Sequence, residues 1–184
     1  MLRYMGIYGG LSGATIAAII LAGIVLAGGG FFTSVVFGYL VMLVALAFVF
    51  VGVKRYRDVE LGGVIRFWPA LGLGLGISVV AGLIYAGVWE GYLASTNYAF
   101  MEHYSAAMLK SYEQSGMTGA ELDAARQEMA RMVELYDHFW FRVPMTIVEM
   151  LPAGVLVALV SAALLRNPKL LPARAPPAPQ RAGG

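Results

Sequence analysis

Two glutamates stand in or beside strongly apolar sequence, and their side chains are the best placed in this chain to do chemistry. Glu90 ends one apolar stretch, and Glu149 lies about two helical turns into another. A carboxylate in hydrocarbon costs about 2.5 kcal/mol or more, so each must be paired, protonated or in contact with water. The groups that could serve as partners are Arg142, His138, Thr146 and the tyrosine hydroxyls.

Three interpretations of the two glutamates are open. The first is a structural polar clamp, in which both side chains point into a helix bundle and at least one binds a partner from that set. The second is a proton- or ligand-binding site of a small transporter or sensor. The third is simple exposure at a membrane interface. We favour the clamp, because a buried carboxylate without a partner would have to be protonated.

A serine motif indicates chemistry that the rest of the chain does not support. Residues 10–13, Gly-Leu-Ser-Gly, have the form of the nucleophile motif of rhomboid-type intramembrane proteases. Such a serine needs a base within hydrogen-bond reach. The chain has two histidines, His103 and His138, and both lie in a distant hydrophilic segment. On the topology derived below they are on the order of 20 Å from Ser12, so we expect no protease.

Metal and nucleotide sites have weak signatures. Glu134 and His138 are one helical turn apart and are of types that bind zinc, but charged faces of exposed helices show the same pattern. Residues 72–76, Gly-Leu-Gly-Leu-Gly, resemble a dinucleotide loop but lie inside an apolar run with no preceding strand. The chain has no cysteine, which excludes thiol nucleophiles and thiolate metal sites. We expect neither a metal nor a cofactor.

Four long apolar stretches must position all of these residues. They cover residues 4–27, 34–53, 68–88 and 143–165. Each has about 20 residues or more, enough to cross a hydrocarbon layer of about 30 Å. Of the 184 residues 59% are hydrophobic and only 13% are charged, against about 25% charged in a soluble domain. The sequence therefore predicts an all-α membrane protein with four transmembrane helices and no affinity for nucleic acid.

Basic residues alternate along the chain as four crossings require. They are Arg3 before the first stretch, Lys54, Arg55, Arg57 and Arg66 between the second and third, and Arg166 and Lys169 after the fourth. Lysine and arginine near helix ends favour the cytoplasm. Both termini and residues 54–66 are thus predicted to be cytoplasmic. The connection at residues 28–33 carries no charge.

Residues 94–142 then lie outside the cytoplasm and are predicted to form a two-helix hairpin. This segment has four basic and seven acidic residues. Apolar residues recur at helical spacing over about 98–115 and 119–136. Gly116 is suited to end the first helix. Thr118 and Glu121 have the spacing of a capping box that would start the second.

Glycines recur four residues apart in the apolar stretches, a spacing that lets helix backbones approach closely. The pairs are Gly9 and Gly13, Gly72 and Gly76, and Gly87 and Gly91. We expect them to pack helices, either within the chain or between copies.

The two ends of the chain are predicted to differ, with a helix at the N-terminus and a disordered tail at the C-terminus. Residues 167–184 are rich in proline and alanine and are predicted to be a disordered cytoplasmic tail, after one transmembrane domain over residues 1–166. The first apolar stretch could instead be a signal peptide cleaved after Ala27. We favour a retained helix, because the run is longer than a usual signal sequence.

Several separated motifs resemble a family of bacterial membrane proteins, domain of unknown function 4199. They are Tyr56-Arg57-Asp58 with residues 60–65 (Glu-Leu-Gly-Gly-Val-Ile), residues 87–90 (Gly-Val-Trp-Glu), Phe100-Met101 with Tyr104, and residues 146–152 (Thr-Ile-Val-Glu-Met-Leu-Pro). The resemblance extends to Arg166. It implies four transmembrane helices in a bacterial cytoplasmic membrane, and it implies no activity.

The function expected from these features is not enzymatic. The glycine faces and the lack of a nucleophile–base pair favour a scaffold or accessory subunit that contacts lipid and either a membrane protein partner or further copies of itself. A small transporter or proton-linked sensor using Glu90 and Glu149 is the alternative. A lipid-modifying enzyme is a second alternative.

Overall fold

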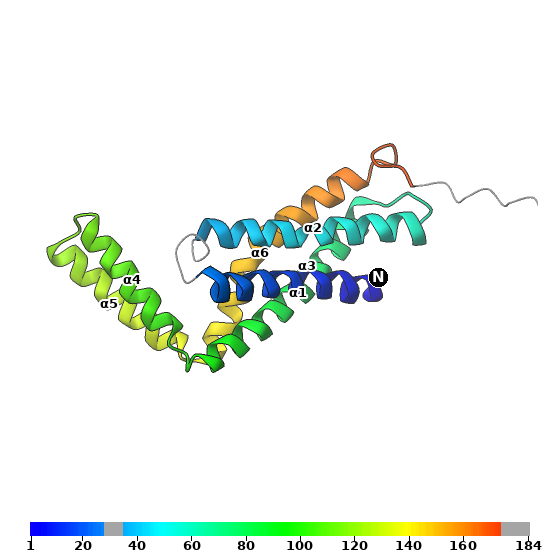
Figure 1. Cartoon of the computed structure of the whole chain (residues 1–184). Coiled ribbons are helices and arrows are strands. Elements are labelled where there is room, and N and C mark those ends of the chain that lie inside the picture. Colours follow the sequence, from blue (N-terminus) through cyan, green and yellow to red (C-terminus); the bar gives the residue numbers. More distant parts are fainter. Residues whose placement is uncertain (28–34, 174–184) are drawn as a thin grey trace, which may run out of the picture. The chain divides into compact units, whose positions relative to one another are not determined.

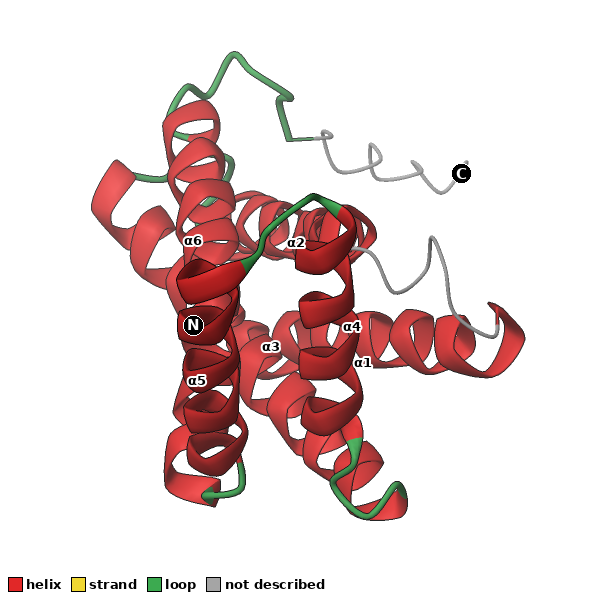
Figure 2. Cartoon of the chain, turned by 90° about the vertical axis from the view of Figure 1, so that its left-hand side faces the viewer, coloured by secondary structure: helices red, strands yellow, loops and turns green. Residues whose placement is uncertain are grey.

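The computed structural model describes residues 1–27 and 35–173, and its elements there are all helices (Figures 1 and 2). They are α1 (Leu2–Ala27), α2 (Val35–Glu60), α3 (Phe67–Ser95), α4 (Phe100–Gln114), α5 (Gly119–Tyr136) and α6 (Phe139–Leu165). The uncharged connection at 28–33 and the tail residues 174–184 lie outside the described residues. The predicted all-α class is confirmed.

Two helices, α3 and α6, are long and apolar enough to cross a membrane. They have 29 and 27 residues, so each exceeds a hydrocarbon thickness of about 30 Å at about 1.5 Å per residue. Core helices of soluble proteins can have the same length and composition. Membrane spans at α1 and α2 remain a prediction.

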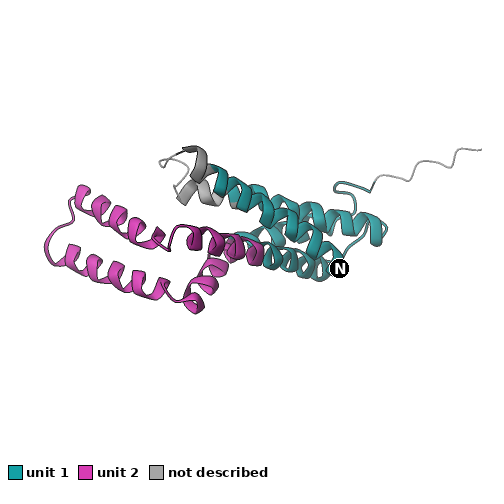
Figure 3. Cartoon of the chain, turned by 60° about the horizontal axis from the view of Figure 1, so that its bottom comes forward, with its two compact units in different colours: residues 1–81, 153–184 teal, residues 82–152 magenta. Residues whose placement is uncertain are grey.

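The chain divides into two compact units (Figure 3). Unit 1 contains residues 1–81 and 153–184, and unit 2 contains residues 82–152. The divisions fall inside α3 and α6, beside Gly82 and Pro152. Glycine and proline are the residues that most weaken a helix, so both divisions stand at local weak points of the helical chain.

Unit 1 is held together where glycines let helices touch. α1 and α2 pack side by side (Figure 1). A Cβ added at Gly9 would lie 2.6 Å from the Val80 Cβ and 2.9 Å from the Ile77 carbonyl oxygen. One added at Gly74 would lie 3.0 Å from the Ala158 Cβ. A larger residue at Gly9 would force the neighbouring helix to move, and one at Gly74 would require Ala158 to shift by a few tenths of an ångström, so both positions favour glycine at a helix contact.

The glycine prediction is correct for only part of its set. Gly9 and Gly76 contact neighbouring side chains, and Gly13 is buried. Gly72, Gly87 and Gly91 have open space where a Cβ would be, so they pack no helix within the described chain. The spacing places two glycines on one helix face, but it does not determine whether a neighbour covers both.

The turn between α2 and α3 accounts for the glycine pair in the motif at residues 60–65. Gly62 and Gly63 have φ of +63° and +94°, a region that side chains with a Cβ rarely adopt. The Gly63 amide donates a hydrogen bond of 2.9 Å to the Arg57 carbonyl oxygen. The glycine pair thus closes the end of α2 and turns the chain toward α3.

The hairpin of unit 2 has nearly the predicted bounds. α4 and α5 lie side by side (Figure 1), and Gly116 has the left-handed φ, +90°, expected after a helix end. The predicted capping box is wrong, because the Thr118 side chain makes no capping hydrogen bond. Gly119, the first residue of α5, has φ +61°, a left-handed conformation that favours glycine.

Candidate functional site

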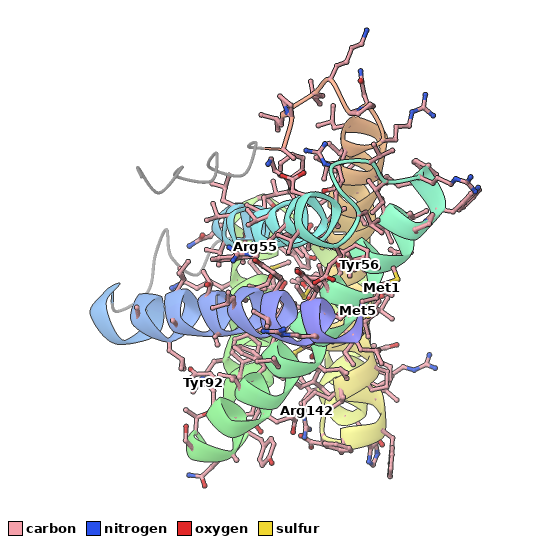
Figure 4. The ribbon with its side chains drawn as sticks, turned by 90° about the vertical axis from the view of Figure 1, so that its right-hand side faces the viewer. Met1, Met5, Arg55, Tyr56, Tyr92 and Arg142 are labelled. Carbon is pink, nitrogen blue, oxygen red and sulfur yellow. The ribbon has the colours of Figure 1, made fainter. Side chains whose placement is uncertain are left out.

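A buried arginine on α6 forms the polar centre of unit 2. The Arg142 guanidinium (Figure 4) donates from Nε to Glu90 Oε1 at 2.6 Å and from Nη2 to Glu90 Oε2 at 2.8 Å. The Arg142 and Glu90 side chains are 4% and 18% exposed. Two parallel bonds between a planar guanidinium and a carboxylate are the strongest ion-pair geometry available to proteins. The prediction that at least one of the two glutamates has a partner among Arg142, His138, Thr146 and the tyrosines is thus confirmed, for Glu90.

The same guanidinium also closes the end of the hairpin. Arg142 Nη1 donates to the carbonyl oxygens of Tyr136 at 2.7 Å and Asp137 at 3.2 Å. Tyr136 is the last residue of α5. The final carbonyls of a helix lack partners within it and carry partial negative charge. Arg142 therefore joins three chain segments: the end of α3, the end of α5 and the start of α6.

Aromatic residues enclose this centre. The guanidinium carbon of Arg142 lies 4.7 Å from the centroid of the Tyr98 ring, within the range of a cation–π contact. Asn97 and Tyr98 both have positive φ, +51° and +57°, which costs energy at residues other than glycine. The strained turn between α3 and α4 is what brings the Tyr98 ring to the arginine.

The Trp89 indole of α3 reaches the same region. Its Nε1 donates a hydrogen bond of 2.9 Å to the Tyr136 hydroxyl, and its ring meets that of Phe100 edge-on at 4.9 Å between centroids. Burial raises the pKa of the Tyr136 phenol, although the bond from Trp89 acts in the opposite direction. The phenol therefore stays neutral and serves as a hydrogen-bond acceptor.

The other predicted partners have lesser roles. Thr146 is buried, and its hydroxyl donates to the Arg142 carbonyl oxygen at 2.9 Å, one turn back along α6. His138 is exposed. Its carbonyl oxygen accepts hydrogen bonds from the amides of Phe141 and Arg142. His138 thus contributes to this region through its backbone carbonyl.

Glu149 does not join the centre, and the prediction that both carboxylates point into a bundle is wrong for it. Glu149 is exposed, whereas Thr146 and Met150 on either side are buried. At about 100° per residue it stands at the margin of the buried face of α6, beside exposed Met145 and Pro152. The sequence pattern places Glu149 within one turn of the buried face but cannot locate its edge.

Unit 1 contains a second buried arginine, which the sequence pattern does not reveal. Arg57, near the end of α2, is fully buried. Its Nε donates to Asp58 at 2.7 Å, and its terminal nitrogens donate to the carbonyl oxygens of Leu165, Leu170 and Leu171. The positive-inside pattern accounts for Arg57 as one cytoplasmic charge among several. Its place in the Tyr-Arg-Asp motif was the only sign of a particular role.

This arginine also corrects the predicted tail. Leu165 is the last residue of α6, and Leu170 and Leu171 belong to the segment predicted to be disordered from residue 167. The carbonyls of Leu170 and Leu171 are instead held by Arg57, so this part of the predicted tail packs against α2. Each unit thus contains one buried arginine that binds a carboxylate and the carbonyls that end a helix.

The remaining candidate motifs are accounted for in part. The Ser12 hydroxyl is buried and donates to the Ala45 carbonyl oxygen at 2.9 Å, a helix-packing contact between α1 and α2. Within residues 1–27 and 35–173 no cluster of three metal-binding side chains is present. The hydrogen bonds of Ser12, Arg57 and Arg142 each join separate segments, which suits these side chains to holding helices in place.

Comparison with known proteins gives one match. The family model described as protein of unknown function (DUF4199) matches residues 6–167. All of the motifs that carry the resemblance fall inside this range. No curated protein and no solved structure matches the chain.

Proposed function

Because the chain belongs to the DUF4199 family, whose function is unknown, we propose a role from its own residues: a non-enzymatic accessory subunit or scaffold of the bacterial cytoplasmic membrane. In this proposal α1, α2, α3 and α6 all cross the bilayer. The α4–α5 hairpin lies outside the cytoplasm. The protein acts by binding a membrane helix of another protein along one exposed face of α6.

Aromatic residues at the helix ends support the membrane placement. Along α3, Trp68 and Trp89 are about 21 residues apart, a rise of about 32 Å, close to a hydrocarbon thickness of about 30 Å. Trp68 is 75% exposed, and Trp140 at the start of α6 is 85% exposed. Exposed tryptophans are enriched where a membrane meets water. They set the two boundaries that this topology needs.

The topology can be tested with reporters. A reporter fused after Arg166 is expected to be active only in the cytoplasm, because the basic residues at 54–57 and 166–169 lie on that side. One inserted at Gly116, in the hairpin turn, is expected to be active only outside. Paired reporters, each active in one compartment alone, make the measurement. The reverse pattern at either position would contradict the proposed topology.

The observation that carries the proposed role is the exposed carboxylate on α6. Three of the exposed residues of α6 in unit 2 follow the 4-3 spacing of a helix–helix seam. They are Met145, Glu149 and Pro152, here called the α6 seam. Glu149 lies about nine residues, or about 13 Å, beyond Trp140. At that depth a carboxylate facing lipid is costly, whereas a donor from a neighbouring helix would satisfy it.

The chemistry of the partner follows from this placement. Glu90 is already bound by Arg142, so Glu149 has no share in that ion pair. A partner helix bearing a lysine, an arginine or an amide at the same depth would complement the seam. Interhelical hydrogen bonds of this kind contribute about 0.6–2 kcal/mol in membranes. The apolar members of the seam would add close packing.

A photocrosslinking amino acid placed along the seam tests this role in cells. At Met145 it is expected to capture one membrane protein, because the partner would lie against that position. Leu83 on α3 is the control and should capture little, although it is more exposed, at 56% against 42% for Met145. Glu149→Leu should reduce the capture at Met145, while Glu149→Gln should retain part of it. Equal capture at both positions, or capture unaffected by Glu149→Leu, would contradict the proposal.

The exposure of Glu149 favours a second candidate function, a proton-linked transporter or sensor. In this candidate Glu149 is the available carboxylate, since Arg142 holds Glu90 in an ion pair. A pH-dependent flux into vesicles that Glu149→Gln abolishes, in a protein that still folds, would favour this candidate over the scaffold.

A further inference from the structure

A groove of about 650 Å³ lies at the end of α2 in unit 1. Its wall on one side is α2, and on the other it is the segment that follows α6. The lining residues are Val51, Lys54, Arg55, Asp58, Val59, Leu171, Pro172 and Ala173. The second wall exists because Arg57 holds the carbonyls of Leu170 and Leu171. The groove is therefore a product of the fold and not of one helix surface.

The charge of the groove is positive. Lys54 and Arg57 share a single carboxylate, that of Asp58. Burial alone would raise the pKa of Asp58, but the hydrogen bonds from Lys54 and Arg57 lower it overall, so this carboxylate stays ionised. Arg55 is exposed (Figure 4), and its side chain has no hydrogen bond or ion pair among the described residues. Of the lining residues, Lys54 and Arg55 are cations and Asp58 is the single anion, which the buried Arg57 also binds, so the groove is short of negative charge.

The groove also has an apolar side. Val51 and Val59 on α2 are 47% and 63% exposed, and Leu171 is 49% exposed. Val51 lies about one helical turn from Lys54 on the side of the predicted membrane span, and Val59 lies about one turn beyond Arg55 on the opposite side. Along α2, apolar wall thus flanks the lysine and arginine within about 6 Å. A molecule with an acyl portion beside an anionic group fits that combination of surfaces.

We propose that the groove binds a phosphate group, with Lys54 and Arg55 as its ligands. Arginine and lysine are the usual binders of phosphate, arginine through its planar fork and lysine as a point charge. The apolar wall favours the headgroup of an anionic phospholipid over free phosphate. That choice of source rests on the membrane topology proposed above, whereas the phosphate site itself rests only on the groove.

Lipid binding to the purified full chain in a neutral detergent tests the assignment. Native mass spectrometry compares phosphatidylglycerol with phosphatidylcholine, which has the same phosphate but no net charge. We expect phosphatidylglycerol to bind about tenfold more tightly or better, the scale of one charge-assisted hydrogen bond. Measurable but equal binding of the two lipids would overturn the proposal.

Paired variants locate the site. Lys54→Gln with Arg55→Gln should remove the preference for phosphatidylglycerol, whereas Arg66→Gln with Arg166→Gln removes the same charge from exposed positions outside the groove and should keep it. Arg55→Gln alone is a control for misfolding, because it leaves the Lys54–Asp58 ion pair intact. This single change should still weaken binding of phosphatidylglycerol several-fold. An equal loss in the control pair would overturn the proposal.

Inorganic phosphate separates the two sources. Millimolar phosphate is expected to displace phosphatidylglycerol from the unmodified chain but not from the Lys54→Gln/Arg55→Gln variant. That result would show that the groove recognises the phosphate group of the lipid. If phosphate binds while phosphatidylglycerol does not, the phosphate site stands and the lipid source is wrong. Since these measurements use detergent, they are independent of the reporter and crosslinking results that test the proposed function.

Discussion

Arg142→Ala is expected to lower the free energy of unfolding by about 3 kcal/mol, the largest effect of any single substitution in unit 2. The change leaves the Glu90 carboxylate, 18% exposed, without its cation. It also leaves the carbonyls of Tyr136 and Asp137 without a donor at the end of α5. Thermal and denaturant unfolding in mild detergent, followed by circular dichroism, measures the loss.

A double-mutant cycle separates the ion pair from the other contacts of Arg142. Glu90→Gln, Arg142→Gln and the double variant should show a coupling energy of about 2 kcal/mol, because the two side chains interact directly through two bonds. Arg142→Lys should recover little stability, since an ammonium group cannot reach both the carboxylate and the carbonyls. Additive effects of the two single changes would contradict a clamp.

Arg57→Met is expected to release the segment after α6, raising the rate of trypsin cleavage after Lys169 about tenfold or more. Methionine approximates the volume of the buried side chain but donates nothing to the carbonyls of Leu165, Leu170 and Leu171. The loss of one bond from a charged donor suffices for a tenfold change in local opening. Mass spectrometry of timed digests measures cleavage at this site.

The control for this experiment is Arg66→Met, which removes a basic residue that is exposed. It should leave the cleavage rate after Lys169 unchanged. Arg57→Met should also widen the phosphate groove, because Leu171 to Ala173 form one of its walls. An unchanged cleavage rate in Arg57→Met would show that other contacts hold the segment after α6. The hydrogen bonds from Arg57 would then not be needed to keep it in place.

The sequence by itself determined the local features of this protein. Helix bounds in the hairpin agree within two residues with the predicted 98–115 and 119–136, because apolar spacing and Gly116 act over single turns. The short set of partners for Glu90 contained the correct one. The family could also be inferred from the sequence, because several separated motifs occur in one order along the chain.

The tertiary structure decided what depends on distant segments. Glu90 and Arg142 are 52 residues apart, and Arg57 reaches carbonyls 108 to 114 residues away. No local pattern shows that Arg57 is buried, that Glu149 is exposed or that Gly74, and not Gly72, meets a neighbouring helix. Spacing along a helix fixes which residues share a face, but only the packing of other segments determines which part of that face is covered.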